Sequence, residues 1–266
     1  MKITQYALNT DKFIGSITIA VVSDLHARPY DKALAALRSI CPDVILLPGD
    51  IVEIATEYMD RRNQCGLDFL KKAAEIAPCY YCYGNHEIYH THAGPHRSKT
   101  PDKVFGEEYV KRIVSYGVHL INDCDCAVKL SDKKGNEVDL LIGGLVCGRD
   151  MDPALNSPEP DLNYLKHFSE KEGYKILLCH YPHYYEKYLK GVALDLVLSG
   201  HAHGGQWRIF GQGIYAPHQG LFPKYTSGLH SKNHIISRGA ANNVKPIPRL
   251  FNHCEVLEIN ITGNKK

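Results

Sequence analysis

The feature that most constrains the fold is a repeated order of segments that begins at Ile17. A short apolar run is followed by a polar turn and then by a segment with apolar residues at helical spacing. The apolar runs are ITIAVV, DVILLP and CYYCY, and the segments between them are DKALAALRSI and GLDFLKKAAEIA. This alternation is typical of βαβ units, in which neighbouring strands of one sheet run parallel. The first part of the chain is therefore predicted to be an α/β structure.

The pattern changes after residues 89–104, a polar and histidine-rich stretch with the composition of a long loop. The runs AVKLS and VDLLIGGLV are separated by a turn, DKKGNE, and predict two more strands. Two further buried strands are predicted in KILLCH and LDLVLSGHAH, and the last fifty residues predict loops and short strands. With 266 residues, 44% of them hydrophobic, the chain can form one large core, so a single domain over residues 1–266 is expected.

Charge and cysteine content bear on partners and on location. A net charge of +2 gives no general field that would attract nucleic acid, so no nucleic-acid partner is expected. The nine cysteines are odd in number and irregular in spacing, which favours a reduced protein. Cys79 and Cys82 form a CxxC motif, but they lie in a β-like run where residues three apart point to opposite faces. A structural role is therefore favoured for this pair over a redox or zinc site.

The hydropathy pattern predicts neither a signal peptide nor a membrane span. The first residues lack a continuous apolar segment, and no stretch reaches the roughly 18 apolar residues that a membrane-spanning helix needs. A cytoplasmic location is expected, with peripheral contact to a membrane left open.

Polar side chains of metal-binding types follow the predicted strands one after another. They are Asp24 and His26, then Asp50, then Asn85, His86 and Glu87, then His180, and finally His201 and His203. In open α/β sheets the ligand crevice lies outside the carboxyl ends of the strands, so these side chains are predicted to meet at one rim.

The donor types in this set indicate which ions could bind. Carboxylate, amide and imidazole donors without thiolate suit divalent manganese, iron or zinc. Even without His86 and Glu87, the seven remaining donors are too many for one catalytic ion that must keep a position open for water or substrate. Two ions that share a carboxylate fit better, and Asp50 is the candidate bridge.

The ordered set DLH, GD, GNHE, a later histidine and GHAH resembles the signature of the calcineurin-like metallophosphoesterase superfamily. The continuation GHAHGGQWRIFGQGIYAPHQGLFPKYTSGLH is similar to the subgroup of bacterial membrane-associated and cell-envelope phosphoesterases, some of which act on nucleotide-linked lipid precursors. The resemblance implies a four-layer α/β/β/α sandwich, in which two mixed β-sheets are flanked by helices.

The same resemblance implies a role for each motif residue. The first metal would be bound by Asp24, His26 and His203, the second by Asn85, His180 and His201, with Asp50 bridging the two. His86 would donate a proton to the leaving oxygen, and Glu87 would orient its imidazole. The implied reaction is hydrolysis of phosphodiester or pyrophosphate bonds by a metal-bridging hydroxide at a binuclear centre.

Several alternatives stay open at this point. The enzyme could instead be a phosphomonoesterase, including a protein phosphatase, or the fold could be a non-catalytic metal-binding scaffold. The substrate is expected to be a small phosphoester or a lipid-linked nucleotide, with Arg28 and Arg149 as candidate contacts for its phosphate. Residues 89–104 could form a lid over the phosphate or a solvated loop. The aromatic residues of the segment 207–225 could contact an acyl chain or a membrane, although packing within the last hairpins is favoured.

Overall fold

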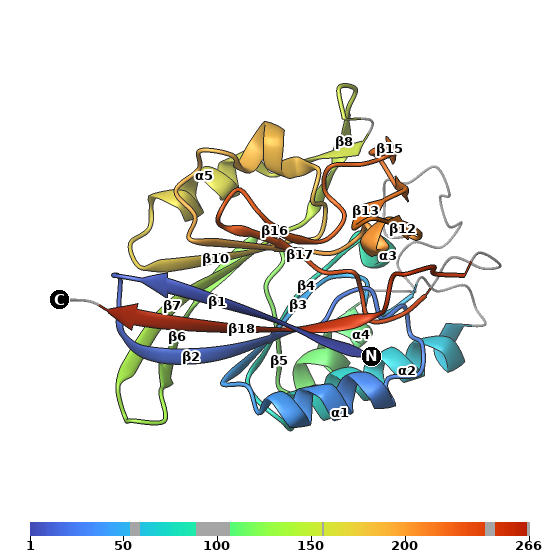
Figure 1. The fold of residues 1–266 in the computed structure, drawn as a ribbon. Coiled ribbons are helices and arrows are strands. Elements are labelled where there is room, and N and C mark those ends of the chain that lie inside the picture. Colours follow the sequence, from blue (N-terminus) through green and yellow to red (C-terminus); the bar gives the residue numbers. More distant parts are fainter. Residues whose placement is uncertain (54–58, 89–106, 156, 243–247, 265–266) are drawn as a thin grey trace.

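Two six-stranded sheets form the centre of the molecule (Figure 1). The computed structural model describes residues 1–53, 59–88, 107–155, 157–242 and 248–264. In spatial order, the first sheet contains β1 (Lys2–Thr10), β18 (Glu255–Asn264), β2 (Ile14–Val21), β3 (Val44–Pro48), β4 (Cys79–Cys82) and β5 (Val118–Leu120). The second contains β16 (Gly228–His230), β17 (His234–Ile236), β11 (Leu196–Ser199), β10 (Tyr174–Cys179), β7 (Glu137–Leu145) and β6 (Cys124–Ser131).

Both sheets are mixed. In the first sheet β2, β3, β4 and β5 run parallel, and β18 is antiparallel to β2. In the second sheet β7, β10, β11 and β17 run parallel, and β6 and β16 pair antiparallel at the two edges. The predicted hairpin around DKKGNE is β6 and β7, so that prediction is confirmed.

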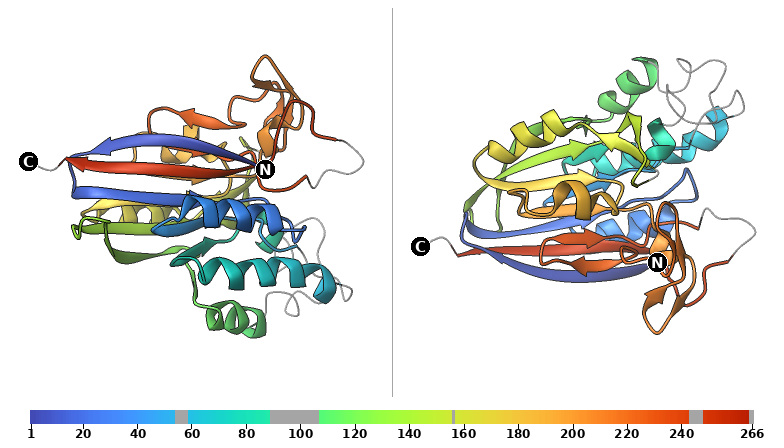
Figure 2. Two further views of the ribbon diagram at one scale, coloured as in Figure 1. Left: turned by 60° about the horizontal axis from the view of Figure 1, so that its bottom comes forward. Right: turned by 90° about the horizontal axis from the view of Figure 1, so that it is seen from above.

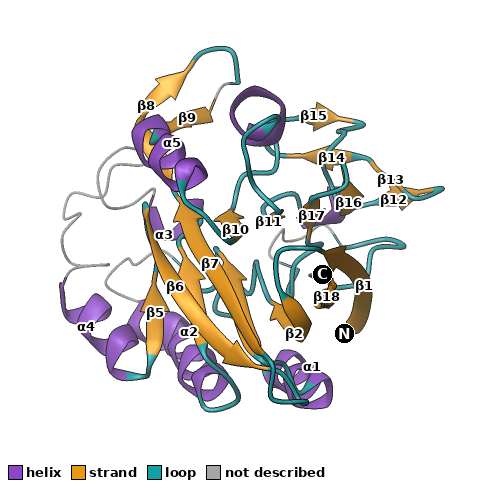
Figure 3. Cartoon of the chain, turned by 90° about the vertical axis from the view of Figure 1, so that its left-hand side faces the viewer, coloured by secondary structure: helices purple, strands orange, loops and turns teal. Residues whose placement is uncertain are grey.

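Helices cover the outer face of each sheet. The first sheet carries α1 (Asp31–Ile40), α2 (Met59–Ala74) and α4 (Glu107–Ser115), and the second carries α5 (Leu162–Glu170) and a π-helical turn, η2 (Tyr185–Leu189). Figure 3 shows α1, α2 and α4 along the bottom and α5 at the top, with the sheets between them. The four-layer α/β/β/α prediction is therefore confirmed.

Successive side chains of a strand point to opposite faces of the sheet, which explains how one chain fills three apolar layers. On β3, Val44 and Leu46 pack between the two sheets, whereas Ile45 and Leu47 pack against the helices. Cys79 and Cys82 likewise lie in different layers, as their spacing in β4 predicts. All nine cysteines are free.

The first strand was not predicted from the sequence. β1 pairs in parallel with β18, with Lys2 opposite Glu255, and β18 lies between β1 and β2. Figure 2 shows the red β18 between these two blue strands. The two ends of the described chain are thus joined in one sheet.

Shorter elements lie around the rim. They are α3 (Asn85–Ile88), β8 (Cys147–Asp152), β9 (Ser157–Pro160), η3 (His203–Gly205), β12 (Arg208–Ile209), β13 (Gln212–Gly213), β14 (Tyr215–Ala216) and β15 (Gly220–Leu221). Among the described helices, none combines the length and the apolar composition needed to cross a membrane.

Candidate metal centre

The carboxyl ends of the parallel strands bring the predicted side chains together at one rim. The loop after β2 is tied to the loop after β3, since the Asp24 N–H donates to the Gly49 carbonyl at 3.1 Å. The loop after β11 is tied to the end of β10 by a hydrogen bond from the Gly200 N–H to the His180 carbonyl, also 3.1 Å. The two sheets are linked where the His201 N–H donates to Asp24 Oδ1 at 2.9 Å. Side chains far apart in the sequence therefore share one site.

Asp24, His26 and His203 form the first group of ligand-type side chains. One nitrogen or oxygen atom from each lies within 4.8 Å of the others. The Nε2 atoms of His26 and His203 are 3.2 Å apart, and His203 Nε2 lies 3.6 Å from Asp24 Oδ1. All three residues are buried. A buried carboxylate beside two imidazoles requires a compensating partner, because burying a charge without one is costly.

Asp50, His180 and His201 form the second group, which is also buried. His180 Nε2 lies 3.0 Å from Asp50 Oδ2. The same carboxylate oxygen is 3.8 Å from His26 Nε2 of the first group. Asp50 therefore lies between the two groups.

A divalent cation fits the unsatisfied atoms of this site. Among the described residues, Asn85 Oδ1 and His201 Nε2 are buried and have no hydrogen-bond partner. An amide oxygen can only accept, so a donor or a cation is what the Asn85 position lacks. The donors are oxygen and nitrogen without thiolate, which suits manganese, iron or zinc.

The backbone is strained at several of the candidate metal ligands. Five of the candidate metal ligands have φ between 47° and 66°, namely Asp24, His26, Asp50, His201 and His203. Left-handed conformations cost such residues on the order of 1 kcal/mol each, and they cluster at functional sites. Gly200 allows a close approach beside them, because a Cβ there would lie 2.4 Å from Asp24 Oδ2. The chain thus retains an unfavourable local conformation where these side chains meet.

His86 lies next to the two groups of ligand-type side chains but is not a member of either. Its N–H donates to Asp50 Oδ1 at 2.9 Å, which follows from its position in the first turn of α3. Its Nε2 lies 4.0 Å from Asp50 Oδ2, and its side chain is 26% exposed. An imidazole that adjoins the site and reaches solvent can exchange a proton with a bound ligand.

Glu53 is a site residue that the sequence analysis missed. One of its oxygens lies 2.9 Å from His26 Nδ1 and the other lies 2.9 Å from His86 Nδ1. Burial alone would raise the pKa of Glu53, but the hydrogen bonds from these two imidazoles lower it to about 2. Glu53 therefore fixes the orientation of two rings at once. Its only sequence signal is its position three residues after Asp50.

Glu87 does not contact the His86 imidazole, contrary to the expectation from the sequence. It is fully buried, and its carboxylate accepts hydrogen bonds from the backbone N–H groups of Gly84, Asp50, Ile51 and Val52. The Tyr81 hydroxyl donates to the same carboxylate. Glu87 thus holds the loops after β3 and β4 together, and the partner of the imidazole is Glu53.

The charges of the site favour cation binding. Burial on its own would raise the pKa of Asp50, yet the surrounding imidazoles hold it well below the usual range. Burial opposes protonation of His86 and His180, but the charge of Asp50 raises the pKa of each to about 9. Burial is the main cause that lowers the pKa of His201 and His203. Neutral imidazoles and ionised carboxylates are the forms that bind metals. Asp50, His201 and His203 are therefore in the form that binds a metal, whereas His180 would release a proton on binding one.

Two further residues near the site gave no sequence signal. Arg249 Nη2 lies 3.0 Å from His203 Nδ1, and its guanidinium also donates to the carbonyls of Arg238 and Ala241. His183 is buried, and neither of its ring nitrogens has a hydrogen-bond partner among the described residues. Its ring centroid is 6.2 Å from that of His201.

The candidate substrate contacts are only partly described. Arg28 follows His26 in the same loop and is partly buried. Arg149 belongs to β8, but its side chain lies outside the described part of the chain, as does the predicted loop at residues 89–104.

The comparison with protein families places the chain in a known family. The model of the calcineurin-like phosphoesterase family matches residues 17–205, which include the candidate metal ligands. This chain belongs to that family. Both groups of ligand-type side chains lie within the matched residues.

Similar proteins are found in distant organisms. The chain is 26% identical over 257 residues to an uncharacterized metallophosphoesterase of Campylobacter jejuni, covering 96% of this chain and 60% of that protein. It is 24% identical over 263 residues to a protein of Caenorhabditis elegans named as a metallophosphoesterase, covering 93% of this chain and 49% of that protein. The chain thus spans about half to three fifths of the length of these curated relatives.

Among solved structures, the chain is similar to the calcineurin-like phosphoesterase YfkN from Bacillus subtilis. The TM-score is 0.48 at 15% sequence identity, and the match covers 85% of this chain and 82% of that chain.

Proposed function

We propose that this chain hydrolyses phosphodiester or pyrophosphate bonds at a binuclear metal centre. The observation that carries the proposal is the position of Asp50, whose Oδ2 lies 3.0 Å from His180 Nε2 and 3.8 Å from His26 Nε2. The Asp50 carboxylate would contact both metals. The remaining ligands would be Asp24, His26 and His203 for one metal and Asn85, His180 and His201 for the other.

Bound divalent cations supply Lewis acidity, which lowers the pKa of water and offsets charge on phosphoryl oxygens. The residues of the chain orient the ligands and move a proton. The Pro48 carbonyl lies 2.7 Å from His180 Nδ1, and Glu53 lies 2.9 Å from His26 Nδ1, so the Nε2 atoms of both rings face the site. Glu53 also accepts from His86 Nδ1, which leaves His86 Nε2 to donate a proton to the leaving oxygen.

Three finer points belong to the same proposal. Arg28, two residues after His26, is proposed to contact the phosphoryl group of the substrate. The chain is proposed to fold as one domain, which is supported by an apolar layer that draws on residues from Phe13 to Ile261. The membrane-associated and cell-envelope subgroup is proposed from the motif GHAHGGQW and the segment that follows it.

Metal analysis combined with two parallel assays tests the function. We expect about two metal equivalents per chain after loading with Mn²⁺, and faster turnover of bis-p-nitrophenyl phosphate than of p-nitrophenyl phosphate. Faster turnover of the monoester would favour a phosphomonoesterase or protein phosphatase. Full metal loading without turnover of either ester would favour a scaffold. The control is His167→Gln on the exposed face of α5, which should change neither metal content nor rate.

A further inference from the structure

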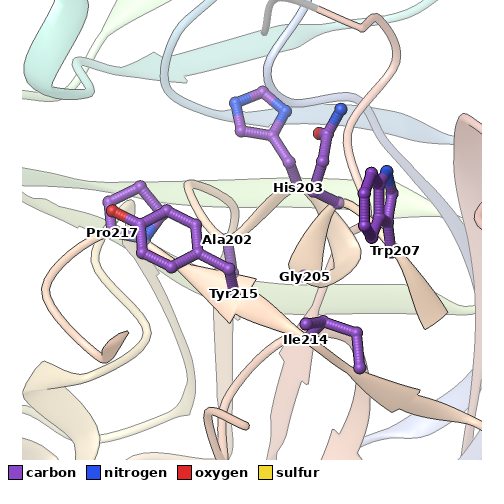
Figure 4. A pocket seen from close by; sticks show the side chains of 8 residues that line it. Ala202, His203, Gly205, Trp207, Ile214, Tyr215 and Pro217 are labelled. Carbon is purple, nitrogen blue, oxygen red and sulfur yellow. The ribbon is translucent and has the colours of Figure 1, made fainter. Parts of the chain in front are cut away.

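A pocket with almost entirely apolar walls opens beside His203. Its volume is about 260 Å³, and its lining includes His203, Trp207, Ile214, Tyr215 and Pro217. Figure 4 shows Trp207 on the right and Tyr215 with Pro217 on the left, with His203 above and Ile214 below. Among the residues that the structure describes, no lysine, arginine, aspartate or glutamate lines it. We refer to this feature as the apolar pocket.

Hydrogen bonds hold the walls of the apolar pocket in place. The Trp207 indole N–H donates to the Pro248 carbonyl at 2.8 Å, so the ring cannot turn freely. The Ile214 N–H lies 2.9 Å from the Trp207 carbonyl and 3.1 Å from the Gly205 carbonyl, which joins opposite walls through the backbone. The pocket is therefore formed before a ligand binds, as small-molecule sites usually are.

The large side chains of the apolar pocket remain open to solvent. Trp207 is 42% exposed and Tyr215 is 53% exposed. Both are rigid side chains that lose little entropy when a ligand covers them. An apolar ligand group would remove this surface from water, which is favourable.

The geometry points to an apolar alkyl or aryl group of the substrate, attached to its phosphoryl group, as the occupant of this pocket. The inference rests on the proposed function. His203 contributes to both sites: it lines the pocket, and its Nε2 lies 3.6 Å from Asp24 Oδ1 in the candidate metal centre. A phosphoryl group at that centre would therefore be separated from the pocket by the His203 side chain alone, within reach of a substituent that it carries. The substrate class is a phosphoester with an apolar substituent.

Trp207 provides a direct test, because it is the only tryptophan in the chain. Its fluorescence would be followed while the Mn²⁺-loaded protein is titrated with methyl, butyl or octyl phosphate. We expect a blue shift and an affinity about 100-fold higher for octyl than for methyl phosphate. This corresponds to full burial of about three to four of the additional methylenes, at roughly fourfold each. An affinity that does not change with chain length would overturn the inference. So would 1-octanol binding as tightly as octyl phosphate, because the pocket would then act independently of the phosphoryl site.

A kinetic series tests the pocket through catalysis. The substrates would be the p-nitrophenyl esters of methyl, butyl and octyl phosphate. We expect Tyr215→Ser to lower kcat/KM for the octyl ester about tenfold more than for the methyl ester, because a wall of the pocket is lost. Phe210→Ala, at a fully exposed side chain outside the lining, is the matched control and should leave this ratio unchanged. An equal loss for both esters in Tyr215→Ser would contradict the inference.

Trp207 fluorescence and ester hydrolysis together distinguish failure of the proposed function from failure of the pocket assignment. If the wild-type protein hydrolyses no ester but Trp207 still reports chain-length-dependent binding of alkyl phosphates, the proposed function fails and the pocket assignment stands. If esters are hydrolysed with no preference for chain length and the Trp207 emission does not shift, the function stands and the pocket assignment fails.

Discussion

The candidate metal centre and the apolar pocket meet at His203 and are opposite in construction. At the centre, Asp24 and Asp50 are polar and at most 1% exposed. In the pocket, Trp207 and Tyr215 are largely apolar, and about half of each is exposed. Each arrangement is unfavourable without a ligand, because one buries charge and the other hydrates apolar surface. A cation relieves the first cost and an apolar group relieves the second.

The elements that carry the candidate metal centre also differ from those that carry the apolar pocket. The centre lies at the ends of β3 and β10, two strands that are buried along their whole length. The pocket is lined by residues around η3 and β14, and β12 to β15 are strands of only two residues each. Catalytic groups carried by the core are held rigidly, whereas surface segments tolerate sequence change. If both proposals hold, the core would determine the reaction and the segment after His203 would determine the substrate preference.

The largest effect on turnover is expected for Asp50→Asn, and this variant tests whether the candidate metal centre and the apolar pocket act separately. Asp50→Asn removes the charge that lies between both ligand groups and should lower turnover about 1000-fold, or ~4 kcal/mol. Metal content, measured by elemental analysis, should fall with it. The tighter binding of octyl than of methyl phosphate, measured through Trp207 fluorescence, should persist, since Asp50 does not line the pocket. Loss of that preference would mean that the two regions are not separable.

The next largest effect on kcat is expected for His86, which lies at the candidate metal centre but is not assigned as a metal ligand. His86→Gln should lower kcat roughly 100-fold, because proton transfer to the leaving oxygen is lost. Metal content should stay at the wild-type level. A substrate whose leaving group needs no protonation, such as a p-nitrophenyl ester, should be affected less than an alkyl ester. A loss of metal that parallels the loss of rate would instead identify His86 as a ligand.

A smaller effect is expected for the residue that orients two rings. Glu53→Gln keeps the shape of the side chain but removes its charge, and it should lower kcat about tenfold with little change in KM. The cause is weaker orientation of His26 and His86, which lie 2.9 Å from the two carboxylate oxygens. Glu53→Asp, which keeps the charge, should recover part of the rate. Equal losses in both variants would indicate that the length of the side chain matters more than its charge.

The fold was predictable where local patterns determine it. The apolar runs at β3 and β10 are followed at once by Asp50 and His180, so strand ends and candidate ligands could be read from the same residues. β1 was missed because its residues are half exposed, and its only sheet partner, β18, begins at Glu255, far along the chain.

The site was predictable only as far as motif residues and strand ends reach. The contacts of Glu53 with two imidazoles depend on how the loop after β3 folds back, which no periodicity encodes. Arg249 approaches His203 from a segment 46 residues later in the chain. The role assigned to Glu87 was wrong at the level of contacts, because adjacency in sequence does not imply that two side chains touch in the first turn of a helix.

The smallest effect concerns Asp123, a partly buried carboxylate that belongs to neither region. Burial is the main cause that raises the pKa of Asp123 to about 6, although the Val146 N–H donates to its Oδ1 at 3.0 Å. The folded pKa is above the unfolded value of 3.8, so the contribution of this group to stability is complete below about pH 4. It is lost as the pH rises through about 6, where the buried carboxyl ionises.

Asp123→Asn removes this ionisation and keeps an acceptor for the Val146 N–H. The backbone φ of 47° at this position is one that asparagine tolerates. Because the side chain is partly exposed, the full shift is discounted, and we expect the variant to be more stable by about 1 kcal/mol at pH 8 and equal to wild type at pH 4. Urea unfolding at the two pH values measures this difference. Asp139→Asn, at an exposed carboxylate, should show no pH-dependent difference. If Asp123→Asn gives the same difference at both pH values, its effect comes from packing and not from ionisation of the Asp123 carboxyl.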